Sequence, residues 1–384
     1  MKWEKLEIGK VSKVISGFAF KSKDFKPIGT PVIKIKNIKD ENIVLDESDC
    51  VDSAIEVPLR FHLSKGDILI SLTGSHITLP SSVVGRVAKY RHETNSYLNQ
   101  RAGKFINIDN EKCYKDFLFY FLLQKETLTR IANKAQGAAN QANISPGDVE
   151  GVEINLPPVF TQRRIASILS AYDDLIENNL KRIKLLEEKA QLHYKELMQD
   201  SVKWDKIRLE EFVSVVKGRK PSSVLEQPED DSQLYLLLDT VERGKTLYTS
   251  DLTLPQSKIT DVLMCMDGAR SGLSFRGMVG AIGSTMAIWR SNSETVSGEF
   301  LYQFMKQNES AITQGNTGAA IPHANRKFIL DMKMSIPPKN EAENFDGLTL
   351  PMIKLINTLH NQNAKLREAR DILLPKLMNG QIEV

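Results

Sequence analysis

Histidines and cysteines are among the residues of this chain that could bind a metal ion. The six histidines, at positions 62, 76, 92, 193, 323 and 360, do not form the His-Glu-x-x-His pattern that holds catalytic zinc. The three cysteines, Cys50, Cys113 and Cys265, are odd in number and far apart. This spacing argues against both a disulfide framework and a Cys-x-x-Cys zinc site. We therefore expect no metal on this chain.

Three short motifs could support catalysis or phosphate binding, but each lacks a required part. Adenine methyltransferases need two prolines directly after an asparagine, whereas Asn155-Leu156-Pro157-Pro158 has an intervening leucine. The Gly268–Gly272 loop lacks the Gly-Lys-Ser/Thr ending of a phosphate-binding loop. The acidic run 229–231 has no strand-borne partner that would complete a nuclease site. We expect the chain itself to be non-catalytic.

Charge is weakly basic overall and strongly basic locally. The 384 residues carry a formal net charge of +3, which does not identify a partner. Residues 1–40, however, hold ten lysines against four acidic residues, a local net charge of +6. Such a block is either a solvated face or a surface that faces phosphate groups.

The longest uninterrupted pattern runs from Thr161 to Asp200, without proline or glycine. Apolar residues recur every three and four positions over about five heptads, which predicts a long helix packed along a partner helix. We call the predicted contact stripe the seam, and it has two rows. One row holds Leu169, Ile176, Ile183, Ala190 and Leu197, and the other holds Ile165, Tyr172, Asn179, Leu186 and His193. At ~1.5 Å per residue, forty residues make a rod of roughly 60 Å.

The chain also contains an internal duplication. Pro337-Pro338 repeats Pro157-Pro158 at an offset of 180 residues, and the same offset transfers the seam to the C-terminus, at Met352, Ile356, Leu359, Asn363, Leu366, Arg370, Leu373 and Leu377. Trp204 repeats Trp3 at an offset of 201 residues, so the second copy is about 21 residues shorter than the first. Each copy is predicted to comprise a mixed region followed by a long helix, and the two helices are predicted to touch along their seams. Asn179 and Asn363 on the seams are either solvated positions or a polar pair that fixes register.

The mixed regions show strand patterns with a few helical segments, so the predicted fold class is α+β. Predicted strands lie at 31–37, 66–72, 83–88 and 260–266, and predicted helices at 117–132 and 299–311. The predicted segments are a first mixed domain at 1–158, a central helix at 159–200, a second mixed domain at 201–338 and a C-terminal helical segment at 339–384. Within the last segment we expect the helix to begin near Thr349-Leu350-Pro351.

Several of these stretches together resemble the specificity subunits of type I restriction–modification systems. The C-terminal run Leu366 to Ile382, the Gln162-Arg163-Arg164-Ile165 segment after Pro157-Pro158, and the segments 16–22, 66–69 and 137–145 carry the resemblance, which covers the whole chain. The second copy departs from the pattern because no Gln-Arg-Arg-Ile follows Pro337-Pro338.

The resemblance implies two target recognition domains, each reading half of a split double-stranded DNA sequence. It also implies two conserved helices that pair antiparallel and set the gap. It implies that two methylase subunits dock on the helices and that motor-nuclease (restriction) subunits join through them in an antiviral restriction system. It places S-adenosylmethionine, ATP and magnesium on those partners, with no cofactor on this chain.

Loops after the predicted strands then supply candidates for reading DNA. Base-edge candidates are Thr73, Ser75, His76, Arg270, Ser271 and Ser274. Arg270 is the strongest of these, because arginine paired with guanine is the commonest specific contact. Phosphate candidates are Lys21, Lys23, Lys34, Lys36, Lys217, Arg219 and Lys220.

An alternative function stays open, in which the two mixed domains form a non-catalytic scaffold or antiphage adaptor for another ligand. The N-terminal residues lack the apolar core of a signal peptide, and no apolar run approaches a membrane span. We therefore expect a cytoplasmic protein.

Overall fold

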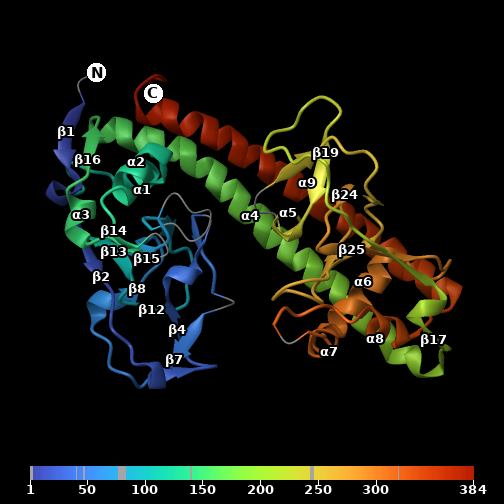
Figure 1. The fold of residues 1–384 in the computed structure, drawn as a ribbon. Helices are drawn as coiled ribbons and strands as arrows, with labels where there is room; N and C mark the ends of the chain where they lie inside the picture. Colours follow the sequence, from blue (N-terminus) through green and yellow to red (C-terminus); the bar gives the residue numbers. More distant parts are fainter. Residues whose placement is uncertain are drawn as a thin grey trace. The chain divides into compact units, whose positions relative to one another are not determined.

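The computed structural model describes residues 3–39, 41–45, 48–76, 84–138, 141–242, 246–318 and 320–384. It divides into two compact units (Figure 1). Unit 1 comprises Met1–Glu177 and Asn363–Val384, and unit 2 comprises Asn178–Gln362. Each unit therefore combines one mixed region with parts of both long helices.

Unit 1 is built on two sheets that share no strand. The order in the first is β2 (Lys13–Ser16), β13 (Ala102–Ile106), β9 (Ile68–Ser71), β11 (Val87–Lys89), β6 (Asn42–Ile43) and β5 (Ile38–Lys39). The order in the second is β3 (Phe25–Lys26), β7 (Asp49–Val51), β4 (Thr30–Ile33), β12 (Ser96–Leu98) and β8 (His62–Leu63). Strand β1 (Glu4–Glu7) pairs with β16 (Glu153–Leu156). Helices α1 (Lys115–Leu123), α2 (Lys125–Ala132) and α3 (Pro146–Glu150) complete the unit.

Unit 2 repeats this topology with fewer strands in each sheet. Its first sheet has the order β18 (Val213–Lys217), β25 (Met286–Ser291), β22 (Val262–Cys265) and β23 (Ser274–Arg276). Its second has the order β20 (Leu247–Thr249), β19 (Gln233–Leu236), β24 (Gly280–Ile282) and β21 (Gln256–Ser257), and β17 (Lys206–Arg208) pairs with β26 (Lys333–Ser335). The helices are α5 (Leu238–Val241), α6 (Gly298–Gln307), α7 (Glu309–Gln314) and α8 (Arg326–Asp331).

The correspondence extends to strand direction. In unit 1 the pair β4–β12 is parallel while β7 and β8 flank it antiparallel, and in unit 2 β19–β24 is parallel with β20 and β21 flanking it antiparallel. The α+β class and the duplication are confirmed.

Several predicted strands are shorter than their patterns. The predicted strand at 31–37 ends at Ile33, because Asn37 Oδ1 accepts a hydrogen bond from the Lys34 amide (2.9 Å) and closes a 3₁₀ turn. The predicted strand at 83–88 begins only at Val87, because Gly85 turns the backbone with φ of 86°; Val83 lies outside the described residues. The predicted helix at 117–132 is two helices, α1 and α2, separated by the extended Gln124.

The long helices are α4 (Val159–Leu197) and α9 (Lys339–Met378) (Figure 1). The expected start of the second helix near Pro351 is wrong, since α9 begins twelve residues earlier, at Lys339. An interior proline removes one backbone hydrogen bond and crowds the carbonyl four residues before it. That residue is Gly347, where an added Cβ would meet nothing within 4 Å. Burial of Ala342, Phe345 and Thr349 before the proline favours continuation of the helix.

The predicted antiparallel pairing is confirmed inside each unit. In unit 1, Leu169 of α4 shares a core cluster with Leu377 of α9. Farther along α4, Ile176 accepts a 3.5 Å hydrogen bond at its carbonyl from Asn363 of α9. In unit 2, Ile183 packs with Ile353, Ile356 and Leu359, and the Tyr194 and Phe345 rings lie 6.3 Å apart. Residue numbers rise along α4 while those of their partners fall along α9.

Most predicted seam residues face these contacts. Buried members are Leu169, Ile176, Asn179, Ile183, Leu359 and Asn363, and half-buried ones are Leu186, Leu366 and Leu373. Leu374, Leu377 and Met378 are buried in the last turns of α9, beside Leu373. Because Asn179 belongs to unit 2 and Asn363 to unit 1, their pairing stays a prediction.

Candidate nucleic-acid interface

Each unit carries a small polar edge after the inner strand of its first sheet. In unit 1, β10 (Thr73–Gly74) follows β9 and pairs with β15 (Gln141–Asn143), which also pairs with β14 (Gln136–Ala138). We call these three strands edge 1. In unit 2, Asp267 follows β22 and forms a bridge with His323, which also bridges Thr317. We call Asp267–Gly272, Thr317 and His323 edge 2.

The two edges are held by equivalent backbone bonds. The Ile144 amide donates to Leu72 O (2.9 Å), and the Ala324 amide donates to Met266 O (2.8 Å). The next residue in each chain segment caps a short helix, since Ser145 and Asn325 accept side-chain hydrogen bonds from the amides of Asp148 and Phe328. Both edges are therefore tied to a buried strand on one side and to a capped helix on the other.

A polar side-chain pair crosses each edge at the same place. In edge 1, Thr73 Oγ1 donates to Asn143 Oδ1 (2.9 Å). In edge 2, Asp267 Oδ1 lies 2.8 Å from His323 Nδ1. Asn143 is exposed and the His323 side chain keeps 49% of its surface accessible. In each pair the second member, Asn143 or His323, is the side chain that faces solvent. Sequence analysis selected neither residue.

The predicted base-reading residues divide by burial. Thr73, Ser75, Ser271 and Ser274 are buried in the described structure. Ser271 Oγ accepts from Asn316 Nδ2 (2.8 Å), and Ser274 Oγ lies 3.8 Å from Met305 Sδ. Their burial argues against direct contact with a base edge and favours a role in shaping the edges.

His76 and Arg270 are the predicted readers that keep accessible surface. His76 is half-buried and Arg270 is exposed, and each stands three residues after the first member of its polar pair. Arg270 forms an ion pair with Glu242, whose side chain is one-third exposed. An exposed pair of this kind contributes little to stability, so Arg270 can exchange its partner at low cost.

The predicted phosphate-binding residues lie mostly at the surface. Lys21, Lys23, Lys36, Lys217, Arg219 and Lys220 are exposed, and Lys34 is half-buried. Lys34 and Lys36 share Asp49, at 2.9 and 3.1 Å, and these hydrogen bonds hold the Asp49 carboxyl pKa below its usual value. Lys217 Nζ lies 3.5 Å from Asp267, which brings one predicted phosphate ligand to edge 2.

A buried ion network joins the helices within unit 1. Arg370 Nη1 donates to Asp173 Oδ1 (2.7 Å) and Arg370 Nη2 donates to Glu41 Oε1 (2.8 Å). The second oxygen of Asp173 accepts from Arg91 (3.1 Å) and from the Tyr120 hydroxyl (2.8 Å). Burial raises the pKa of Glu41 in spite of the opposing attraction of Arg370.

Unit 2 has an arginine between the strand layer and α4. Arg276 Nε donates to Glu299 Oε2 (2.7 Å) and Nη1 donates to Glu187 Oε1 (3.1 Å), while its guanidinium lies 4.3 Å from the Tyr302 ring centroid. These contacts hold α6, β23 and α4 together inside the unit.

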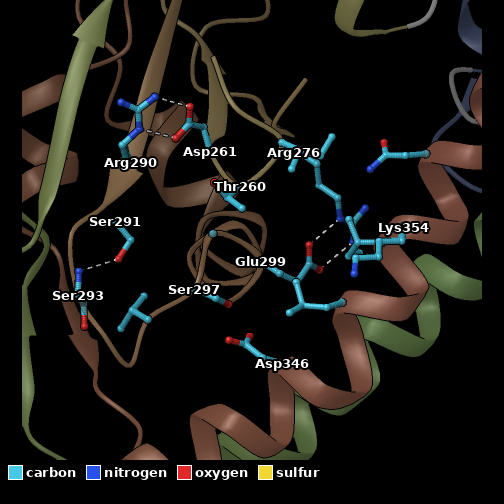
Figure 2. A pocket seen from close by; sticks show the side chains of 16 residues that line it. Thr260, Asp261, Arg276, Arg290, Ser291, Ser293, Ser297, Glu299, Asp346 and Lys354 are labelled. Atoms are coloured by element: carbon cyan, nitrogen blue, oxygen red, sulfur yellow. Dashed lines mark hydrogen bonds and ion pairs between the residues drawn. The ribbon is translucent and has the colours of Figure 1, made fainter. Parts of the chain in front are cut away.

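A cavity of about 530 Å³ lies beside Arg276 in unit 2. Figure 2 shows Asp261 and Arg290 joined by two hydrogen bonds (each 2.7 Å) on one side, and Asp346 of α9 on the other. Asp346 Oδ1 is buried and has no hydrogen-bond partner among the described residues. Burial raises the Asp346 carboxyl pKa, against a hydrogen bond from Ser297 that lowers it.

Replacing Asp346 by asparagine is expected to stabilise the chain at neutral pH, because the ionised carboxyl is held partly out of water. The gain should be at most about 1 kcal/mol, since the group is part-exposed and screened. Because the Asp346 pKa is higher in the folded state, the wild type loses stability as the pH rises from the unfolded-state pKa through the folded-state pKa. The stability gained by Asp346→Asn should therefore vanish below about pH 4. Calorimetric unfolding midpoints at neutral pH and below about pH 4 test this. Glu343→Gln on the exposed side of α9 is the control. Equal wild-type and Asp346→Asn midpoints at pH 7 would contradict it.

Within the described ranges, His, Cys, Asp and Glu form no group of three or more that could hold a metal ion. Among the same residues, no helix combines the length and the apolar character that crossing a membrane requires.

Comparison with known proteins finds similar chains in one family. The model of the type I restriction modification DNA specificity domain matches residues 1–188. A Methanocaldococcus jannaschii chain provisionally named the MjaX type I restriction enzyme specificity subunit is 23% identical over 410 residues, covering 100% of this chain and 94% of that one. The MjaVIII type I specificity subunit of the same organism is 24% identical over 176 residues, 45% of this chain and 41% of its own length.

A solved structure shares the fold. The crystal structure of a type I restriction–modification S subunit from M. genitalium superposes with a TM-score of 0.58 at 16% identity, covering 98% of this chain and 96% of that chain. The matched domain, the full-length relative and the common fold, together with the duplicated topology, are features that this chain shares with type I restriction–modification specificity subunits.

Proposed function

We propose that this chain is the sequence-specific DNA-binding subunit of a type I restriction–modification complex, and that each unit is a target recognition domain for one half of a bipartite site. The observation that carries this proposal is the repetition of one topology with a polar edge at the same place in both units. Two similar but chemically different edges fit two short sequences that differ from each other.

The long helices have two roles in this proposal. As the elements common to both units, α4 and α9 set the gap between the half-sites. They also form the docking site of two methylase subunits, through which restriction subunits join. In this proposal S-adenosylmethionine, ATP and magnesium bind to those partner subunits.

Under this proposal the purified chain neither methylates nor cleaves DNA by itself. The alternative function, a scaffold for another ligand, has no support among the relatives, which are named as restriction enzyme specificity subunits. Salt-dependent binding to a bipartite DNA sequence separates the two functions, since a scaffold for another ligand has no reason to show it.

Replacing Arg270 by alanine is expected to weaken binding to the cognate site by about 1–3 kcal/mol and to relax preference in one half-site only, because a guanidinium that contacts a base edge carries sequence information. Binding to cognate and random duplexes at fixed salt measures the effect. The control is Glu242→Gln, which removes the Arg270 ion pair but keeps the arginine. Equal weakening on cognate and random DNA would exclude Arg270 as a reader.

Lys36→Ala is expected to behave differently, because a phosphate contact carries no sequence information. Binding to all duplexes should weaken by a similar factor, and the slope of log K against log salt should become shallower by about 1. Lys365→Ala, an exposed lysine on α9, serves as a matched control. A change of sequence preference with an unaltered salt slope would show that Lys36 does not bind phosphate.

A further inference from the structure

The polar pairs of the two edges occupy one structural position. Thr73 and Asp267 each come two residues after the end of the inner strand, β9 or β22. Asn143 and His323 each come two residues before the side chain that caps the following short helix. The cross-edge contacts, 2.9 Å and 2.8 Å, join residues that are 70 and 56 positions apart in sequence. The two pairs therefore occupy the same backbone positions, whereas their side chains differ in chemistry.

Backbone hydrogen bonds support this position. Besides the bonds of Ile144 and Ala324 to the inner loops, edge 2 is closed by the Gly268 amide, which donates to Pro322 O (2.9 Å). The Thr317 and His323 backbones exchange two further hydrogen bonds, of 2.9 and 2.7 Å. Side chains held on such a supported edge can present hydrogen-bonding groups in a fixed direction, which sequence readout requires.

The donors and acceptors of the two pairs are different. Asn143 offers both a donor and an acceptor, the combination that pairs with the N6 and N7 edge of adenine. Asp267 offers acceptors only, and a carboxylate accepts from the amino group of cytosine, while His323 adds an imidazole edge. Two reading units that select different bases need such a difference at one position.

Charge compensation in edge 2 fits a site that approaches a polyanion. A lone carboxylate facing DNA would be repelled by the phosphates. Asp267 instead lies between His323 and Lys217, and the Lys217 side chain keeps 61% of its surface accessible. Lys217 can thus offset the charge of Asp267 and still reach a phosphate group.

We propose that Thr73–Asn143 in unit 1 and Asp267–His323 in unit 2 are equivalent specificity-determining pairs, each selecting one base pair of its own half-site. This inference rests on the proposed function and adds to it the position in each unit that distinguishes the two half-sequences.

The test transplants one pair into the other unit. The full-length chain and the double variant Asp267→Thr, His323→Asn are used to select duplexes from a random library at fixed salt. The variant is expected to lose the parent's preference by roughly tenfold at one base pair of one half-site. The other half-sequence and the gap should stay unchanged.

A second, milder variant guards against misfolding of the first. His323→Gln changes an exposed side chain and should alter preference at the same base pair, whereas Lys327→Ala, an exposed residue of α8, should alter nothing. Unchanged preference in both pair variants, or changes spread over both half-sites, would overturn the inference while leaving the bipartite reading intact. Failure of the parent chain to select any bipartite sequence would instead overturn the proposed function and this inference with it.

Discussion

Replacing Arg370 by methionine is expected to lower the free energy of unfolding of unit 1 by about 3–5 kcal/mol, the range for breaking a buried ion pair by removing one partner. Arg370 is 5% exposed, and its guanidinium is the shared donor to Glu41 and Asp173. Methionine keeps much of the side-chain volume but leaves two carboxylates without that cation. The loss should appear as a lower midpoint in calorimetry of the full-length chain.

The local charges explain why this effect should be large. Burial by itself disfavours the charged guanidinium, yet the attraction of Glu41 and Asp173 raises the Arg370 pKa. The same network raises the pKa of the Tyr120 hydroxyl, through burial and the nearby Asp173 charge. Without Arg370, Asp173 would retain Arg91 and Tyr120, whereas Glu41 would lose the partner that opposes its own desolvation.

Two further variants separate the ion network from simple packing. Lys365→Met removes an exposed cation from the same helix and should change the midpoint little. Adding Glu41→Gln to Arg370→Met should recover part of the loss, because the carboxylate charge that Arg370 no longer compensates is removed. A midpoint for Arg370→Met equal to that of Lys365→Met would show that the network does not stabilise the helix pair.

Deleting one matched heptad from both long helices is expected to shorten the gap between the half-sites by about three base pairs. Seven residues span about 10 Å of helix at ~1.5 Å per residue, and each base pair spans ~3.4 Å. Removing residues 178–184 and 355–361 keeps the heptad pattern in register, since Ile183 packs against Ile356 and Leu359 within the deleted layer. The two half-sequences should be unchanged.

Selection from random duplexes reports the gap directly. A control deletion of three residues from each helix breaks the heptad pattern and should destabilise the pairing instead of resetting the gap. An unchanged gap with full affinity after the seven-residue deletions would show that the helices do not measure the distance.

The long helices were predictable because their signals are local. Uninterrupted apolar periodicity and the Pro157-Pro158 boundary define α4, and the repeat of the same features locates α9. The start of α9 was mispredicted because Pro351 was interpreted as the N-terminal boundary of the helix. Burial of Phe345 and Thr349 on the face before it offsets the cost of that proline.

The candidate site was only partly predictable, since its contacts join distant segments. The inner loops could be recognised from the strands that precede them, which led to Thr73, His76 and Arg270. Nothing local indicates that Asn143 meets Thr73 or that His323 meets Asp267, because those pairings depend on the final loops folding back on the inner strands. Burial of Ser271 and Ser274 also arises from packing against Asn316 and Met305, which no spacing rule shows.

The most direct test of two DNA-reading units is to map methylated adenines after coexpression of this chain with its cognate methylase subunit. We expect every chain-dependent modified site to share two short defined sequences separated by a gap of constant length and undefined composition. The methylase expressed without this chain should give no such sites. Modification at one continuous sequence, or a pattern unchanged when this chain is omitted, would contradict the account.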